Sequence, residues 1–206
     1  MQILCLDLEG VLIPEIWQAV AEKTGVAELG KTTRDIPVYD DLMQLRLAAL
    51  EREGVTYATI AEVIATLDPL PGAAAFMEWA RPRVQVAIIS DTFYEFGMPM
   101  MAKLGHPLLL CHRLAIKDGY IRGYHLRQAD PKRHSVQAFQ QLGYRVCAAG
   151  DSYNDVSMLD QADAGAFFCA PDNVLAEFPQ YPKTTNYGEL QSWLADQLDR
   201  SLLLTM

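Results

Sequence analysis

The chain has 206 residues, 50% of them apolar and 21% charged, and its 17 Lys and Arg against 26 Asp and Glu give a net charge of -9. This length suits one core with an insertion better than two equal domains, and the composition excludes long disordered, collagenous or coiled-coil segments. The negative charge disfavours nucleic acid and anionic membrane surfaces as partners, because both repel an acidic protein.

The first predicted element is a strand over residues 3–8, a continuous apolar run that ends in acids before a glycine. Similar runs, each ending in small or acidic residues, cover residues 84–89, 146–149 and 165–169. Such runs, separated by helical patterns, are typical of parallel strands buried on both faces, in a doubly wound (Rossmann-like) α/β fold. In these sheets ligands bind beyond the carboxyl ends of the strands.

The long segment between the first two strands reads as helices alone. Helical patterns cover residues 15–24, 38–53, 56–67 and 72–80. Residues 14–70 are too many for a simple crossover and carry apolar stripes of their own, so we predict a small helical cap there. Residues 1–13 and 71–206 would then form the catalytic α/β core. Caps exclude water and select substrates, although a merely structural insertion is the alternative.

A hairpin follows the second strand. Residues 114–126 surround Asp118-Gly119 with β-rich sequence, which predicts a two-residue β-hairpin that serves as a flap at the edge of the sheet. Two further helices are predicted over residues 130–142 and 187–203. In the first of them we expect Asp130 to be the N-cap, which places Lys132 in the first turn.

The sequence shows no sign of export or of a membrane span. No apolar run approaches the ~20 residues of a spanning helix, and residues 1–7 lack the basic start of a signal peptide. No Cys-x-x-Cys pair occurs, and Cys5 and Cys147 lie in apolar runs that favour buried thiols. We therefore expect a cytoplasmic protein without a zinc site or disulfide; the sequence predicts no oligomeric state.

Acids at the ends of the predicted strands indicate a metal site. Asp7 ends the first strand, and Asp151 and Asp155 follow the third. Carboxylate oxygens suit Mg²⁺, which prefers one or two of them together with water and a phosphate oxygen. The second oxygen of Asp7 would then attack phosphorus and form an aspartyl phosphate. Each acid alone is a weak signal, since an acid after a strand often caps a helix.

Other groups at the same edge would complete phosphoryl transfer. Ser90, Lys132 and backbone N–H groups would hold the equatorial phosphate oxygens, where charge is stabilised during the transfer. Glu9, two residues after Asp7, would give a proton to the departing oxygen and later take one from the attacking hydroxyl.

These motifs, in this order, resemble the haloacid dehalogenase superfamily of aspartate-nucleophile phosphohydrolases. The match covers nearly the whole chain and runs through Asp7-Leu8-Glu9-Gly10, Ile88-Ile89-Ser90-Asp91-Thr92, Lys132 and Gly150-Asp151-Ser152-Tyr153-Asn154-Asp155. Further segments are similar to bacterial phosphoserine phosphatases that also pass the phosphoryl group to homoserine: Pro14-Glu15-Ile16-Trp17, Thr32-Thr33-Arg34-Asp35-Ile36-Pro37 and Ser90-Asp91-Thr92-Phe93-Tyr94-Glu95-Phe96. The resemblance therefore implies phosphoserine as substrate, homoserine as a second acceptor and Mg²⁺ as cofactor.

The resemblance also implies a role for each matching residue. Asp7 and Glu9 would be catalytic, and phosphate would be bound by Gly10, Ser90, Asp91 and Lys132. The metal would be held by Asp7, Glu9 and Asp151, with Asp155 supporting it from behind. Glu15 would meet the substrate ammonium and Arg46 its carboxylate, while Met43 would form an apolar wall and Asn154 a further contact. The sequence departs from the superfamily at Glu9, where most members have Asp, and the added methylene moves the carboxyl group.

Two other interpretations stay open. Another small phosphomonoester is an alternative substrate, because only Glu15, Met43 and Arg46 indicate an amino acid. Taken singly, Arg46 fits an exposed ion pair and Glu15 a first-turn helix acid. A receiver-like phosphoaspartate signalling module shares the acids, the hydroxyl and the lysine, but it has no use for a cap or for an acid such as Glu9.

Overall fold

The computed structural model describes residues 1–32, 35–36 and 38–203, so Thr33, Arg34 and Pro37 of the segment singled out above lie outside the described residues. The strands are β1 (Gln2–Leu6), β2 (Gln85–Phe93), β3 (Leu108–Lys117), β4 (Tyr120–His125), β5 (Arg145–Gly150), β6 (Ala164–Phe168) and β7 (Lys183–Thr184). The α-helices are α1 (Ile16–Thr24), α2 (Tyr39–Arg52), α3 (Tyr57–Thr66), α4 (Ala73–Ala80), α5 (Tyr94–Lys103), α6 (Pro131–Gln141), α7 (Val156–Gln161), α8 (Asp172–Glu177) and α9 (Tyr187–Leu203), and the 3-10 helices are η1 (Ala27–Gly30) and η2 (Tyr153–Asp155). Within these ranges no helix has both the length and the apolar content that crossing a membrane requires.

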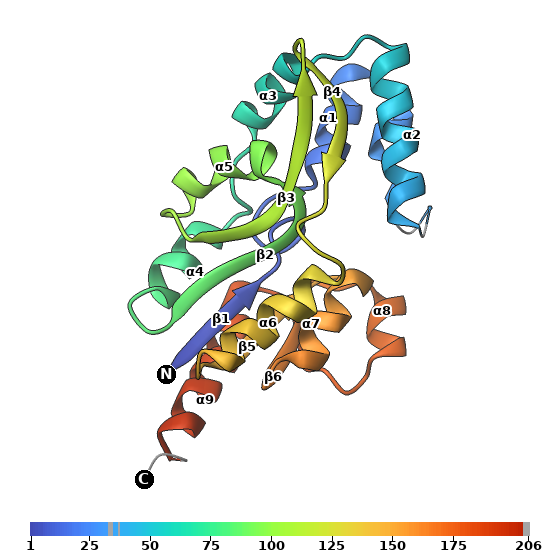
Figure 1. Cartoon of the computed structure of the whole chain (residues 1–206). Coiled ribbons are helices and arrows are strands. Elements are labelled where there is room, and N and C mark those ends of the chain that lie inside the picture. The colour runs from blue at the N-terminus through green and yellow to red at the C-terminus, as the bar shows by residue number, and fades with distance from the viewer. Residues whose placement is uncertain (33–34, 37, 204–206) are drawn as a thin grey trace.

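A seven-stranded sheet with the order β4-β3-β2-β1-β5-β6-β7 runs through the molecule (Figure 1). Its neighbouring strands are parallel except for β3 and β4, which are antiparallel. Helices connect the parallel strands, so the predicted doubly wound α/β class is confirmed. The four predicted strands and six predicted helices are all present. The helices α5, α7 and α8 were not predicted; Pro99 and Gly97 hide the helical pattern of α5.

β1 lies at the centre of the sheet and is buried on both faces. Leu4 packs in an apolar cluster that includes Phe76 of α4, whereas Cys5 packs in a second cluster that includes Val136 of α6. Successive side chains of a strand point to opposite faces, so helices must cover both. This explains why β1 is apolar from Ile3 to Leu6 and why the thiol of Cys5 is buried, as predicted.

The carboxyl ends of three strands lie level with one another. Leu6 of β1 pairs with Ile88 of β2 on one side and with Ala149 of β5 on the other. The residues that follow these pairs therefore share one edge of the sheet. The pairing of β2 with β3 changes register between Ile89 and Phe93, which places the Ser90 segment in an irregular part of the strand.

The predicted hairpin is present and does more than form a flap. Asp118 and Gly119 have φ angles of 53° and 79°, the left-handed conformation that a tight hairpin turn requires. The first half of β3 extends the sheet instead, with Leu109 parallel to Ile88 of β2. That half was not predicted, because the hairpin pattern begins only at Leu114.

The helices α1, α2 and α3 lie together beyond the carboxyl end of the sheet, beside the tip of the β3–β4 hairpin (Figure 1). The hairpin is bound to α2 by an ion pair of 2.9 Å between Arg122 and Glu51 and by a hydrogen bond of 2.5 Å from the Tyr124 hydroxyl to Asp40. Apolar residues of α1 and α3, among them Ile16, belong to the same buried cluster as β1. The division into a core and a cap over residues 14–70 stays a prediction.

Asp130 is the N-cap residue of α6, with Pro131 as the first helical residue, as predicted, but the cap hydrogen bond expected of its side chain is absent. Its backbone is left-handed, with φ 42° and ψ 58°, and its side chain makes no cap hydrogen bond. N-cap residues need an extended backbone to turn the carboxylate toward the first helical amides. The carboxylate of Asp130 instead accepts hydrogen bonds of 2.8 Å from Nε of Arg133 and from the Ser157 hydroxyl.

Candidate active site

A cavity of about 750 Å³ opens at the carboxyl ends of β1, β2 and β5. Residues 1–13 and 71–206 contribute to its lining Asp7, Glu9, Ser90, Asp91, Thr92, Asp151, Ser152, Tyr153, Asn154 and Asn173. Residues 14–70 contribute Glu15, Trp17, Gln18, Thr32, Tyr39, Leu42 and Arg46. The cavity therefore lies between the edge of the sheet and the helices α1 and α2, where both kinds of side chain reach a small ligand.

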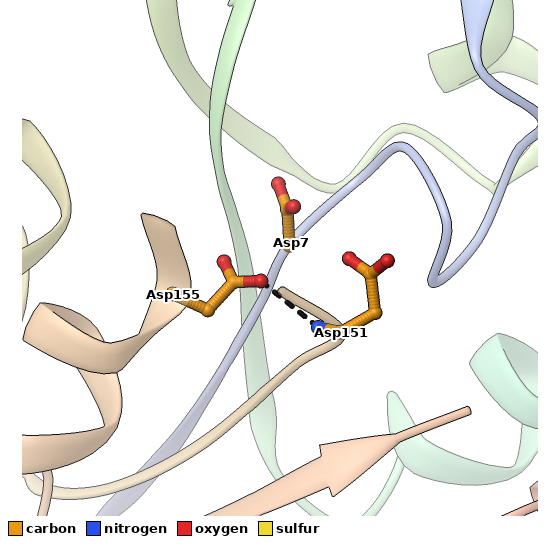
Figure 2. A group of neighbouring side chains, drawn as sticks. All are labelled: Asp7, Asp151 and Asp155. Atoms are coloured by element: carbon orange, nitrogen blue, oxygen red, sulfur yellow. Dashed lines mark hydrogen bonds between the residues drawn. The ribbon is translucent and has the colours of Figure 1, made fainter. Parts of the chain in front are cut away.

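Asp7, Asp151 and Asp155 converge from separate parts of the chain (Figure 2). Asp7 follows β1, Asp151 follows β5 and Asp155 ends η2. One oxygen of each lies within 4.8 Å of the other two. Gly10 makes room for this arrangement, because a Cβ on it would stand 2.6 Å from Oδ2 of Asp151, and its φ of 79° also favours glycine.

Lys132 is buried among the acids. Its Nζ lies 2.5 Å from Oδ1 of Asp155, 3.1 Å from Oδ1 of Asp7 and 3.9 Å from Oδ2 of Asp91. Only 1% of the lysine is exposed, which excludes the surface role that its position in a first helical turn also allowed. A buried ammonium requires such partners, because it has lost its water.

Asp155 uses both of its oxygens for hydrogen bonds. Oδ1 accepts from Lys132, and Oδ2 accepts from the backbone N–H groups of Asp151 and Ser152 at 2.9 and 3.0 Å. The dashed line in Figure 2 marks the bond to Asp151. Asp155 therefore fixes the loop that carries Asp151, which suits the predicted supporting role better than direct binding of a metal.

The charges of this cluster shift the pKa of its members. Burial raises the pKa of Asp7 well above its ordinary value, and Asp155, Asp151 and Asp91 raise it further against the opposing effect of Lys132. Burial alone would lower the pKa of Lys132, but the three carboxylates near it hold that pKa well above its ordinary value. A divalent cation between Asp7 and Asp151 would relieve this repulsion, so the donor set fits Mg²⁺.

Glu9 does not belong to the group of three acids. Its longer side chain reaches the start of α1, where Oε2 accepts a hydrogen bond of 2.9 Å from the N–H of Ile16. Burial and the nearby charge of Glu15 raise the pKa of Glu9 to about 7. A carboxyl group with that pKa can give and take a proton near neutral pH, so the geometry favours the predicted acid/base role over the predicted metal role.

Ser90 and Asp91 lie on β2 at the mouth of the cluster. The Ser90 hydroxyl is 4% exposed and accepts a hydrogen bond of 3.2 Å from the N–H of Thr92. Gly10, in contrast, donates its N–H to the carbonyl of Ile13 at 2.9 Å. Its predicted phosphate contact therefore lacks a free donor, and its observed contribution is the space that it leaves for Asp151.

The carboxylate of Asp91 joins two neighbouring elements. Oδ2 accepts a hydrogen bond of 2.9 Å from the Asn154 amide, and Oδ1 lies 3.5 Å from Nε2 of His112. Burial raises the pKa of Asp91, but Lys132, His112 and Asn154 outweigh it and hold the pKa at about 2. Asp91 is therefore ionised and holds the Asn154 side chain through a hydrogen bond. The sequence predicted only a phosphate contact for Asp91.

Arg46 lies in the wall of the cavity that faces the sheet and is only 7% exposed. Its Nη2 donates a hydrogen bond of 2.6 Å to the carbonyl of Lys31, and its Nη1 lies 3.7 Å from Sδ of Met43. No acceptor among the described residues contacts its Nε. Burial lowers the pKa of Arg46 to about 10, while Glu9 and Glu15 favour the charged form.

The predicted apolar wall is not formed by Met43. Met43 is fully buried, does not line the cavity and contacts Nη1 of Arg46 through its sulfur, whereas the preceding residue, Leu42, lines the cavity. The side chains of successive helical residues point about 100° apart. Leu42 therefore points to the cavity, and Met43, the next residue, does not.

Tyr39 has no counterpart in the sequence prediction. From the first turn of α2 its hydroxyl donates a hydrogen bond of 3.2 Å to the carbonyl of Asp91. Its ring stands edge-on to the ring of His112, with centroids 6.3 Å apart. Both contacts join positions more than fifty residues apart in the chain, and no local pattern reveals them.

Comparison with known proteins shows the family and the fold of the chain. A family model described as a haloacid dehalogenase-like hydrolase matches residues 1–163. The chain is 58% identical to phosphoserine phosphatase ThrH of Pseudomonas aeruginosa, over 99% of this chain and 100% of that protein. It is 56% identical to a phosphoserine phosphatase of Pseudomonas syringae pv. tomato, over 99% of this chain and 86% of that one. The crystal structure of phosphoserine phosphatase from T. onnurineus in complex with NDSB-201 shares the fold, with a TM-score of 0.71 at 23% identity over 93% of each chain.

Proposed function

Because this chain belongs to the haloacid dehalogenase-like hydrolase family, we propose that it is a Mg²⁺-dependent phosphomonoesterase that acts on phosphoserine. In this proposal the phosphoryl group passes first to Asp7 and then to water or to the hydroxyl of homoserine. The observation that supports phosphoserine as the substrate is the position of Arg46. Its guanidinium is buried in the cavity wall, and its Nε contacts no acceptor among the described residues. The activity in the names of the relatives supports the same substrate.

Phosphoserine carries three charged groups, and the cavity offers a partner for each. Arg46 would pair with the carboxylate, and Glu15, half-buried in the same lining, with the ammonium. Ser90 and Lys132 would bind the phosphate beside Asp7. A guanidinium matches a carboxylate through two parallel N–H donors, so Arg46 would select an amino acid over a plain phosphate ester.

Asp7 and Asp151 would hold the metal, with Asp155 fixing the loop of Asp151. When bound, Mg²⁺ supplies positive charge that neutralises phosphate oxygens and keeps Asp7 ionised. The remaining acid of the predicted metal set, Glu9, serves proton transfer in this proposal.

The nucleophile is one oxygen of Asp7. Within the described part of the chain both contacts of its carboxylate fall on Oδ1, from the N–H of Leu8 at 2.7 Å and from Lys132 at 3.1 Å. These contacts fix the plane of the carboxylate and leave Oδ2 to attack phosphorus. As the P–O bond of phosphoserine breaks, protonated Glu9 gives its proton to the departing serine oxygen.

The second half of the reaction regenerates Asp7. Glu9, now ionised, takes a proton from water or from the homoserine hydroxyl, and the resulting oxygen attacks the phosphorus on Asp7. Homoserine resembles serine with one added methylene, so the groups that bind serine would also bind this acceptor. The proposal includes small molecules as the only partners, without nucleic acid or membrane, and a cytoplasmic location; the net charge of -9 supports the exclusion of nucleic acid.

The deciding experiment measures phosphate release from phosphoserine with and without Mg²⁺, for the wild type and for Asp7→Asn. We expect Mg²⁺-dependent release that the variant abolishes, and full activity of the variant would overturn the mechanism. Adding homoserine and following the products by ³¹P NMR tests the transfer: phosphohomoserine is expected, and phosphate alone would leave hydrolysis as the only reaction.

A further inference from the structure

Trp17 lies in the segment that resembles phosphoserine phosphatases, and the mechanism above gives it no role. It is the second residue of α1, lines the cavity and is 7% exposed. The guanidinium carbon of Arg46 stands 4.7 Å from the centroid of its ring. A cation at this distance over an indole face is held by the negative face of the ring, most strongly where water is excluded.

The ring of Trp17 is itself fixed by the core. It packs edge-on against Phe96 of α5, with centroids 5.2 Å apart and an angle of 70° between the rings. Phe96 is fully buried. Because protein interiors are closely packed, this contact with a buried ring restricts the movement of the Trp17 ring beneath Arg46.

Two other contacts of Arg46 act on its terminal nitrogens: the Lys31 carbonyl on Nη2 and the Met43 sulfur on Nη1. The Trp17 ring lies against the guanidinium carbon instead. A binding group must be held within about 0.5 Å of its productive geometry to recognise a bidentate partner.

We propose that Trp17 is a positioning residue for the substrate carboxylate: its ring, packed against Phe96, holds the Arg46 guanidinium in place in the wall of the cavity. The inference rests on the proposed function, because it requires a substrate with a carboxylate. It assigns specificity for that group to two side chains, of which only Arg46 contacts the substrate.

The test compares phosphoserine with phosphoethanolamine, the same ester without its carboxylate. We expect Trp17→Leu to raise the KM for phosphoserine about tenfold, with little change in kcat, which is within the strength of a desolvated cation–π contact. Turnover of phosphoethanolamine should not change, because it needs the same nucleophile and no guanidinium. Trp17→Phe retains an aromatic face and should fall between the wild type and the leucine variant.

A second cation–π pair of the chain supplies the matched control. The Arg83 guanidinium stands 4.8 Å over the ring of Trp79 on α4, and neither residue lines the cavity. Trp79→Leu should leave the KM for both esters unchanged. If Trp17→Leu folds poorly, the phenylalanine variant carries the same comparison.

The outcomes separate this inference from the proposed function. A wild type that does not prefer phosphoserine to phosphoethanolamine overturns both. A wild type that does prefer it, with the preference unchanged in Trp17→Leu and Trp17→Phe, overturns only the role of Trp17. Equal losses for both esters would also overturn that role, since they would indicate a general disturbance of the site.

Discussion

The Nζ of Lys132 lies 2.5 Å from Oδ1 of Asp155, and neither side chain is more than 2% exposed. This pair joins the first turn of α6 to the loop after β5 and stands next to Asp7. It is therefore at once a structural link and a part of the phosphate site, and a change in Lys132 should affect stability and activity together.

We expect Lys132→Met to lower the free energy of unfolding by about 3–5 kcal/mol, because it leaves buried carboxylates without their cation. Phosphate release should be lost as well. Urea unfolding measures the first effect. Lys103→Met is the matched control, since its pair with Asp68 at 2.8 Å is exposed and should contribute less than about 1 kcal/mol. Equal losses in the two variants would contradict the prediction.

Gly10→Ala should weaken the metal site. The added Cβ would stand 2.6 Å from Oδ2 of Asp151, so that carboxylate must move, and the Mg²⁺ concentration for half-maximal phosphate release should rise severalfold. Gly119→Ala has the same φ of 79° but nothing within 4 Å of the new Cβ. Both variants should lose about 1–2 kcal/mol of stability from the left-handed backbone, and only Gly10→Ala should change the Mg²⁺ dependence. An unchanged dependence would show that Gly10 does not shape the site.

The raised pKa of Glu9 leads us to expect that the free energy of unfolding depends on pH in metal-free buffer. Its pKa is 4.5 ordinarily and about 7 in the folded state. Between these values the folded state binds the proton more tightly than the unfolded state, so stability falls as pH rises from about 4.5 to about 7 and then levels off. The loss is at most about 3 kcal/mol. Glu9→Gln should lose less over this range, as urea unfolding at several pH values would show; parallel curves for the two proteins would refute the shift.

Tyr39→Phe should weaken the contact between α2 and the sheet edge. It removes the hydrogen bond of 3.2 Å to the Asp91 carbonyl, so we expect a loss of about 1 kcal/mol and a KM for phosphoserine raised severalfold. Tyr57→Phe is the control, because its hydroxyl donates a bond of the same length to the Glu95 carbonyl, away from the cavity lining. It should lose similar stability and keep its KM. A raised KM in both variants would indicate a general loosening.

The sheet and its active edge were predictable because they depend on local sequence. Buried parallel strands form continuous apolar runs, such as Ile3 to Leu6 of β1, and the acids that follow them lie where ligands bind in such folds. The roles of Lys132 at the phosphate and of Asp155 behind the metal came from the resemblance, whereas the burial of Lys132 was not predicted, because a lysine in a first helical turn also fits the surface.

What could not be predicted depends on contacts between distant segments or on a single backbone angle. The sequence does not reveal that Tyr39 reaches Asp91 or that His112 lies beside the same carboxylate. The left-handed backbone of Asp130 turns its side chain away from the helix, and no helical pattern indicates this. Likewise, the apolar pattern of α2 does not tell which of Leu42 and Met43 lines the cavity.

The buried cluster that contains Leu4 of β1 also contains Ile16 of α1, Met43 of α2 and Ile60 of α3. These helices therefore share one hydrophobic core with the sheet and should not fold without it. Heat or denaturant should then unfold the whole chain in one cooperative transition. The helices that line the cavity should unfold only when the sheet unfolds.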